Sequence, residues 1–188
     1  MSLEGARRAA EILGRARWRR SVLMATVIDL GACDGDIMLR ILRQVPPGHV
    51  AAWHAFEPDP RNAATFRRNL SAVRRELGDG RLDCVRLHEI AVSDRSGPVE
   101  MRLSRRLDGG AYSVSSTICT PSGDMATAFP WLSLEERATV ECVTLDAFAP
   151  AHGIEAVELL WCDVEGAERQ VIEGGRKTLE RTRWAFVE

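Results

Sequence analysis

Features that mark membrane, secreted and metal-binding proteins are missing from this 188-residue sequence. No apolar stretch approaches the ~18 residues that a membrane-spanning helix needs, and the N-terminus does not have the charged, apolar and small segments of a signal peptide in that order. The five cysteines form no C-x-x-C pair, and neither they nor the four histidines are spaced like metal ligands. We therefore expect a cytoplasmic protein that binds neither a metal nor a membrane.

Lysine is almost absent as well, because the 25 basic residues are all arginine except Lys177. The 27 acidic residues outnumber them, and the formal net charge is −2. A chain without excess positive charge gives no electrostatic reason to expect a nucleic-acid partner. Its length, with 45% hydrophobic and 28% charged residues, fits one soluble domain with a single core.

What the sequence does contain is a regular alternation of apolar strands and helical segments. Residues 3–20 have the pattern of a basic amphipathic helix, which we assign to an N-terminal segment of residues 1–24. A domain of residues 25–188 follows. Its first part alternates strand and helix over residues 25–30, 36–45, 49–56, 59–77 and 82–92. This order predicts an α/β fold with a doubly wound, mostly parallel, Rossmann-like sheet.

The middle of the chain breaks this alternation. Residues 98–104 and 139–148 alternate polar and apolar side chains, which predicts an antiparallel insertion between the third and fourth strands of the main sheet. Residues 104–131 are polar and rich in small side chains, and we expect them to form a mobile cover over the site. A disordered surface insertion is the alternative. The main pattern then resumes with a strand at 157–164, a helix at 165–181 and a strand at 183–188.

The clearest functional signal is a glycine turn in "VIDLGACDGD", residues 27–36. It does not fit the G-x-G-x-x-G dinucleotide fingerprint, because Cys33 and Asp36 stand where the second and third glycines would. The carboxylates of Asp29, Asp34 and Asp36 would lie near the start of the next helix, where they repel phosphate. They suit a ligand that carries an ammonium and a sulfonium group. S-adenosylmethionine is such a ligand.

A second signal is Glu57, which ends the second predicted strand roughly 20 residues after the turn and precedes Pro58. A carboxylate in this place accepts hydrogen bonds from the ribose hydroxyls of an adenosine. A nicotinamide cofactor would need the same carboxylate, so Glu57 predicts a nucleoside and does not by itself identify a methyl donor. A solvated glutamate at a strand end is the structural alternative.

Five segments, in this order, resemble the FkbM-type methyltransferases, a branch of the class I S-adenosylmethionine-dependent fold. They are "VIDLGACDGD", "FEPDP", "HEIAVSD", "VTLDAF" and "LLWCDVEGAERQVIEGG". The resemblance runs from about Val27 to Glu188, and one departure is Cys33, where the family usually has asparagine. It implies O-methylation of a hydroxyl on a sugar or a natural-product scaffold.

The resemblance also implies a donor site at the carboxyl ends of the strands, as open α/β sheets favour. By resemblance, the methionine part of the donor would be held by the turn after the first strand, the ribose by the end of the second, and the adenine face by the end of the third. The implied residues are Asp29, Gly31, Ala32, Cys33 and Gly35 for the methionine part, Glu57 and Pro58 for the ribose, Ile90 and Ala91 for adenine, and Asp163 near the ammonium or methyl group.

Methylation of an alcohol also requires a base, because the hydroxyl loses its proton during or after the attack. Asp163 and Glu165 are the nearest candidates by sequence, and His88 is the alternative unless it is a strand residue that faces a helix. Glu168 fits a charged first helical turn. These three carboxylates lack a further Mg²⁺ ligand, so we expect no metal. Two other functions stay open, a donor-binding protein without catalysis and a nucleotide-dependent oxidoreductase.

The last predicted strand ends with the chain at Glu188. The sheet of class I methyltransferases has seven strands, and the fifth is the last that this sequence supplies. We therefore expect a domain that is incomplete at its C-terminus, or a homodimer that covers the apolar edge of the fifth strand, since an unpaired edge invites pairing with another chain.

Overall fold

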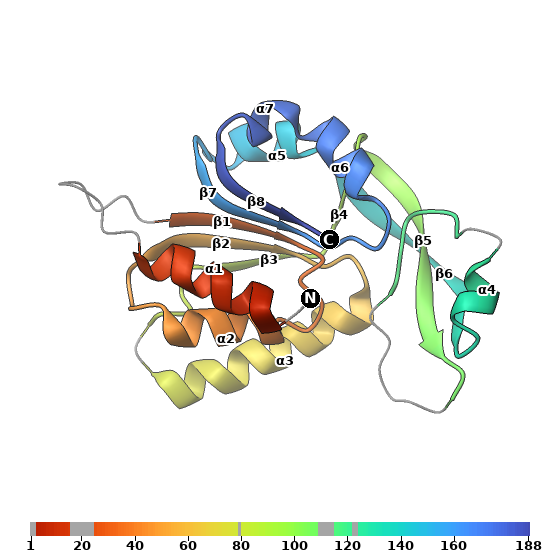
Figure 1. The fold of residues 1–188 in the computed structure, drawn as a ribbon, viewed down its shortest axis with the longest axis horizontal. Coiled ribbons are helices and arrows are strands. Elements are labelled where there is room, and N and C mark those ends of the chain that lie inside the picture. The colour runs from red at the N-terminus through yellow and green to blue at the C-terminus, as the bar shows by residue number, and fades with distance from the viewer. Residues whose placement is uncertain (1–2, 16–24, 79, 109–114, 122–123) are drawn as a thin grey trace.

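The computed structural model describes residues 3–15, 25–78, 80–108, 115–121 and 124–188. Its main feature is a five-stranded sheet in the order β3-β2-β1-β7-β8, in which all neighbouring strands are parallel (Figure 1). The strands are β1 (Ala25–Leu30), β2 (Val50–Phe56), β3 (Val85–His88), β7 (Val157–Cys162) and β8 (Thr182–Val187). The predicted doubly wound, mostly parallel sheet is confirmed.

Helices cover both faces of this sheet (Figure 1). One face carries α1 (Leu3–Arg15), α2 (Asp36–Gln44) and α3 (Pro60–Leu77); the other carries α5 (Leu145–Ala151), α6 (Glu168–Gly174) and α7 (Arg176–Leu179). Successive residues of β1 point to opposite faces. Val27 packs in the cluster that contains α1 and α2, while Ile28 packs in the cluster that contains α5, and both are fully buried. Burial on both faces explains why apolar residues of β1 occupy both faces of the strand instead of alternating with polar ones.

The N-terminal helix packs on this domain. Ala6, Ala9 and Leu13 of α1 are buried in the same core cluster as α2. The predicted helix of residues 3–20 agrees with α1 up to Arg15, and residues 16–20 lie outside the described part of the chain. None of the described helices is both long and apolar enough to cross a membrane.

The helix α3 has a recognisable cap at each end. Asp59 is its N-cap and accepts a hydrogen bond from the backbone N–H of Arg61, and Pro60 occupies the first turn. Gly78 ends the helix in the left-handed conformation, with φ 62°. The entry of α3 lies directly after Glu57, so these caps also fix the backbone next to the predicted ribose carboxylate.

The single strand predicted for residues 82–92 is wrong. β3 ends at His88, and after a bend at Ile90 the chain forms β4 (Ala91–Val92), which pairs in a second sheet of order β4-β6-β5. The apolar pattern runs on through the bend, so periodicity alone does not reveal it. The partner of Ala91 is Cys142, about fifty residues later, and this long-range pairing takes β4 out of the main sheet.

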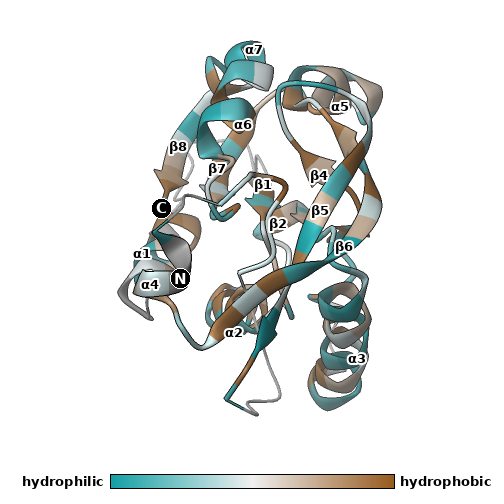
Figure 2. Cartoon of the chain, turned by 90° about the vertical axis from the view of Figure 1, so that its right-hand side faces the viewer, coloured by the Kyte–Doolittle hydropathy of each residue, from teal (hydrophilic) through white to brown (hydrophobic). Residues whose placement is uncertain are grey.

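The predicted antiparallel insertion is confirmed and is larger than expected. β5 (Gly97–Arg106) and β6 (Leu132–Val143) pair antiparallel, with a register shift between Leu103 and Arg105, and the short helix α4 (Met125–Ala128) lies between them. Buried residues of β5 alternate with more exposed ones from Pro98 to Leu103, and the hydropathy of the strand alternates along its length, as the brown and teal bands of Figure 2 show. This view also shows β5 and β6 in front of the strands of the main sheet.

Two predicted elements end or begin elsewhere. The strand predicted for 139–148 stops at Val143, because Thr144 caps α5 by accepting a hydrogen bond from the backbone N–H of Ala147. The helix predicted for 165–181 begins at Glu168 and breaks at Gly174 and Gly175. A Cβ at Gly174 would lie 2.1 Å from the carbonyl oxygen of Ser93. The backbones at Gly174 and Ser93 therefore approach each other closely at the point where the helix breaks.

Candidate functional site

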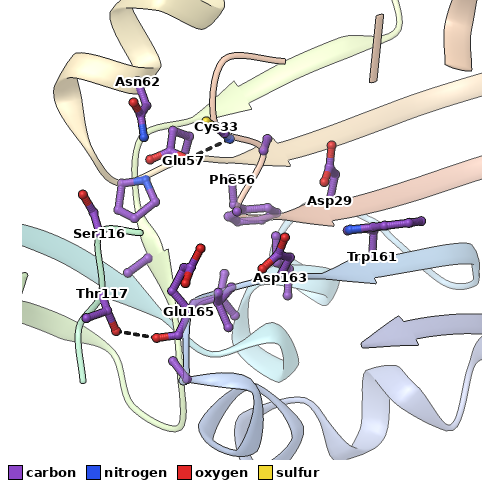
Figure 3. Close-up of a pocket in the computed structure, with 18 of the residues that line it drawn as sticks. Asp29, Cys33, Phe56, Glu57, Asn62, Ser116, Thr117, Trp161, Asp163 and Glu165 are labelled. Carbon is purple, nitrogen blue, oxygen red and sulfur yellow. Dashed lines mark hydrogen bonds between the residues drawn. The ribbon is translucent and has the colours of Figure 1, made fainter. Parts of the chain in front are cut away.

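A cavity of about 290 Å³ opens at the carboxyl ends of β1, β2 and β7 (Figure 3). Its lining comes from the glycine turn after β1, the end of β2, the bend before β4, the loop after β7 and the insertion. Ligands of open α/β sheets bind at this edge of the sheet. The lining includes nine of the residues that the sequence predicts for the donor site: Asp29, Gly31, Ala32, Cys33, Glu57, Pro58, Ile90, Ala91 and Asp163.

The glycine turn is pressed against the end of β7. Gly31 has φ 82°, and the backbone N–H groups of Gly31 and Ala32 both donate to the carbonyl oxygen of Phe56. A Cβ added at Gly31 would lie 1.8 Å from the carbonyl oxygen of Asp163. Only glycine fits this approach, which brings the ends of β1 and β7 together at the floor of the cavity.

Glu57 is buried at the end of β2, with 4% of the residue exposed. Its Oε2 accepts from the backbone N–H of Cys33 at 2.8 Å, and its Oε1 accepts from the backbone N–H of Asp59 at 2.9 Å. Burial raises the pKa of Glu57 to about 8, although these backbone bonds and the Asn62 side chain favour the ionised form. The Glu57 side chain therefore connects the glycine turn to the start of α3 through two hydrogen bonds, and it also lines the cavity.

Asp29 is the second buried carboxylate of the cavity. Its Oδ2 accepts a hydrogen bond from Trp53 Nε1 at 3.1 Å. Burial raises the pKa of Asp29 to about 6; the bond from Trp53 opposes this shift, and the charge of Asp163 adds to it. A positively charged ligand would offset both the desolvation of Asp29 and its repulsion by Asp163, and would so favour the ionised carboxylate.

The loop after β7 supplies Asp163 and Glu165, whose carboxylates point into the cavity (Figure 3). Burial raises the pKa of Asp163, and the charges of Glu188 and Glu168 raise it further. Burial together with Asp163 and Glu168 raises the pKa of Glu165 to about 7. Both groups are thus held in an environment that disfavours negative charge.

The charge of the cavity wall has one sign. Among the lining residues that the structure describes, none is arginine, lysine or histidine, although the chain has 25 basic residues. The lining carboxylates are Asp29, Asp34, Asp36, Glu57, Asp163 and Glu165. Asp36 is partly compensated by Arg40, whose Nε lies 2.6 Å from Asp36 Oδ2 at the surface. Such a lining is electrostatically unfavourable for an anionic ligand.

Comparison with known proteins agrees with this geometry. Residues 29–188 match the family described as the methyltransferase FkbM domain. The chain belongs to the FkbM methyltransferase family. It is 35% identical over 164 residues to 2-O-methyltransferase NoeI of Sinorhizobium fredii (strain NBRC 101917 / NGR234), a match that covers 86% of this chain and 62% of that protein.

The fold of the family is also found in a solved structure, methyltransferase FkbM from Methylobacillus flagellatus KT. The two structures superimpose with a TM-score of 0.52 at 18% identity, over 91% of this chain and 34% of the other. The chain therefore spans less than two thirds of the length of either protein. At this identity the superposition supports the fold. The resemblance of the sequence to FkbM-type methyltransferases is confirmed by the family match.

Two predicted site residues of this member of the FkbM family, Gly35 and His88, are not among the residues that line the cavity. Gly35 is the N-cap of α2 with φ 76°, and a Cβ there would lie 2.8 Å from the ring of Phe66, so it supports the turn from behind. His88, the alternative base, stacks on Phe56 and shares a 3.0 Å hydrogen bond with His54. Its ring also contacts Phe148 of α5. His88 is thus a strand residue that faces a helix, and it is not among the residues that line the cavity.

Glu168 has a structural role in the same loop. Its Oε1 accepts hydrogen bonds from the backbone N–H groups of Val164 and Gly166, both at 3.1 Å. The carboxylate therefore closes the loop that carries Glu165. Within the described residues, no group of three or more histidine, cysteine or acidic residues is arranged to hold a metal ion.

Part of the predicted cover, residues 104–131, lines the cavity. Ser116, Thr117 and Ile118 of this segment are among the lining residues, and so is Met101 of β5, which the sequence does not single out. Residues 109–114 and 122–123 of the cover lie outside the described part of the chain. Two aromatic residues near its end are not buried, because Phe129 is 45% exposed and Trp131 is 38% exposed. No spacing in the sequence shows which residues of the segment return to the strand ends.

Cys33 has a strained backbone. Its φ is 52°, a conformation that asparagine tolerates better than cysteine does. We expect Cys33→Asn, the residue usual in the family, to raise the free energy of unfolding by roughly 0.5–1 kcal/mol. Urea unfolding would measure the change. Cys33→Ala is the control because it removes the thiol and keeps the strain; equal stabilisation by both variants would contradict a backbone cause.

Proposed function

We propose that the chain binds S-adenosylmethionine in this cavity and methylates a hydroxyl group of a sugar or natural-product scaffold. The observation that carries the proposal is the wall of carboxylates without a basic residue among the described lining, in a member of a methyltransferase family. When bound, S-adenosylmethionine supplies a methyl group that is activated by its sulfonium.

The residues present fit this donor. Asp29 and Asp163 lie at the ends of β1 and β7, on either side of the approach at Gly31, and are suited to an ammonium group. The buried carboxylate of Glu57 is suited to ribose hydroxyls, which would donate to its oxygens. Ile90 and Ala91 offer an apolar wall for adenine. A phosphate-bearing nucleotide would meet unfavourable charge at the turn.

The proton of the acceptor hydroxyl needs a nearby base. Glu165 is our choice, because its carboxylate lies at the cavity next to the insertion and its pKa is raised to about 7. Such a group is partly ionised near neutral pH and can accept a proton. Asp163 would then orient the ammonium or methyl region. Much of the acceleration of methyl transfer can come from holding the donor and the acceptor in position in the cavity. The name of the relative NoeI, a 2-O-methyltransferase, supports oxygen as the methyl acceptor.

Calorimetric titration with S-adenosylmethionine, S-adenosylhomocysteine and NAD tests the donor assignment. We expect both adenosyl ligands to bind and NAD to give no heat of binding, because its pyrophosphate faces the carboxylates of the turn. Mass spectrometry of a panel of methyl hexopyranosides incubated with the donor tests the transfer, with a gain of one methyl group expected. Tight NAD binding without an adenosylmethionine signal would overturn the proposal.

A further inference from the structure

We propose that Thr117 of the insertion is a positioning residue, which holds the backbone at Glu165 so that this carboxylate faces the acceptor side of the cavity. The inference rests on the proposed function, which makes Glu165 the proton acceptor. Thr117 contacts the loop after β7 from the opposite wall, across the mouth of the cavity, as the dashed line in Figure 3 shows.

Thr117 is itself firmly placed. Its backbone N–H donates to the carbonyl oxygen of Arg102 at 3.0 Å, and its carbonyl oxygen accepts from the N–H of Arg102 at 2.8 Å. These two bonds attach the segment to β5 as an isolated antiparallel bridge. The residue is 5% exposed. A buried side chain on a paired backbone is a rigid point from which to hold a loop.

The hydroxyl of Thr117 makes two hydrogen bonds whose directions are fixed. The backbone N–H of Cys119 donates to Thr117 Oγ1 at 3.0 Å. The single hydroxyl proton is therefore available for the carbonyl oxygen of Glu165, 2.7 Å away. Removal of this short, partly buried bond leaves the carbonyl of Glu165 without the Thr117 hydroxyl as its donor.

Glu165 needs such support for two reasons. Its backbone has φ 55°, and a residue that is not glycine holds this conformation only when its surroundings impose it. Its carboxylate also lies near the acidic groups of Asp163, Glu168 and Glu188, which repel it. Glu168 fixes the N–H groups on both sides of Glu165, and Thr117 fixes the carbonyl of Glu165. Three hydrogen bonds from Glu168 and Thr117 thus hold the strained backbone at Glu165.

The neighbouring residue connects the same segment to the donor side. Ser116 Oγ donates to Asp59 Oδ2 at 2.8 Å, and Asp59 donates its backbone N–H to Glu57. Ser116 thus contacts Asp59, next to the predicted ribose carboxylate, while its neighbour Thr117 contacts the loop that carries the predicted base. The insertion sets the distance between these two parts of the site, and Thr117 sets the orientation of the base.

The test uses Thr117→Val, Thr117→Ala and Thr117→Ser in the full chain, with Thr65→Val as the matched control. Thr65 Oγ1 also donates to a backbone carbonyl, that of Arg61, but on the exposed side of α3. The readout is the titration of the Glu165 carboxyl by carbon-13 NMR of the ligand-free protein. Amide spectra of each variant show that it is folded, and Thr117→Ala carries the test if the valine variant is not.

We expect the pKa of Glu165 to fall by about one unit or more in Thr117→Val and Thr117→Ala, because the released loop lets this carboxylate move away from the charges of Asp163 and Glu168 and further into water. Thr117→Ser and Thr65→Val should titrate like the parent. With any methyl hexopyranoside that the parent methylates, kcat should fall at least about tenfold in the first two variants, with KM for S-adenosylmethionine unchanged. Thr117→Ser should keep the parental kcat.

An unchanged Glu165 titration in both Thr117→Val and Thr117→Ala would overturn the inference, whatever the activity. A shift in Thr117→Ser as large as in Thr117→Val would also overturn it, because the hydroxyl would then not be the cause. Failure of the parent to bind S-adenosylmethionine would count against the proposed function alone. The titration still decides whether Thr117 controls the environment of Glu165.

Discussion

Replacement of Gly31 by alanine is expected to destabilise the fold by roughly 2–5 kcal/mol and to abolish donor binding. The new Cβ would lie 1.8 Å from the carbonyl oxygen of Asp163, and neither backbone can move without separating the ends of β1 and β7. Alanine also disfavours the φ of 82° that the turn requires. This loss is a large part of the ~5–15 kcal/mol that stabilises an ordinary domain.

Gly48→Ala separates the two causes. Gly48 has a similar φ of 80°, but an added Cβ there would meet nothing within 4 Å. It should therefore lose only the cost of the left-handed backbone, roughly 1–2 kcal/mol, and keep donor affinity. Urea unfolding and calorimetric titration of both variants measure these effects. Equal destabilisation by the two substitutions would show that the approach to Asp163 does not constrain the turn.

The parallel sheet could be predicted because its signals are local. β1 and β7 are mostly apolar runs that end at a glycine turn and an acidic loop, and Asp59 with Gly78 marks both ends of α3. These features depend on burial and on backbone conformation within a few residues. The order of strand, helix and strand then leaves few topologies for the sheet.

The break between β3 and β4 depends on a distant partner. Ile90 continues the apolar pattern of the strand, yet the chain bends there because Ala91 pairs with Cys142 in the second sheet. The start of α5 is different, because its N-cap Thr144 is a local signal. The β3–β4 break depends on tertiary pairing, which the sequence pattern does not show, whereas the end of the strand predicted for 139–148 could have been predicted from this N-cap.

The part of the cavity that lies at the strand ends was predictable for the same reason as the sheet. Asp29, Gly31 and Glu57 lie at the ends of strands whose carboxyl ends meet at one edge. The contact between the insertion and the loop after β7 was not, because Thr117 reaches the loop of Glu165 from a position 48 residues earlier in the chain. His88 shows the limit within a strand: the sequence places it next to the site, but its ring turns to α5.

Glu57→Gln is expected to weaken S-adenosylmethionine binding by about 1–3 kcal/mol and to remove part of its pH dependence. In the ligand-free protein the pKa of Glu57 is raised to about 8 by burial. Ribose hydroxyls donate to the ionised carboxylate and lower this pKa in the complex. The complex therefore binds fewer protons than the free protein, so affinity should increase from pH 7 to about pH 9 and then level off.

The same raised pKa has the opposite effect on the stability of the ligand-free fold. The unfolded chain loses the Glu57 proton near its ordinary pKa of 4.5, whereas the folded chain keeps it up to about 8. The contribution of Glu57 to stability is thus complete below pH 4.5 and is lost as the pH rises through 8. Thermal unfolding of the parent should show this decline between pH 5 and about pH 8, and Glu57→Gln should reduce it.

Dissociation constants measured by calorimetry at several pH values between about 6 and 9 decide the prediction for Glu57. Glu89→Gln is the matched control, since Glu89 is an exposed glutamate that pairs with Arg67 and does not line the cavity. It should bind the donor with the affinity and pH dependence of the parent.

Asp29 and Glu165, whose pKa values are about 6 and 7, account for the rise in affinity that remains in Glu57→Gln at lower pH. A Glu57→Gln variant with parental affinity and the full rise between pH 7 and 9 would place the ribose elsewhere, because the Glu57 carboxyl, whose pKa is raised to about 8, could then not cause the rise.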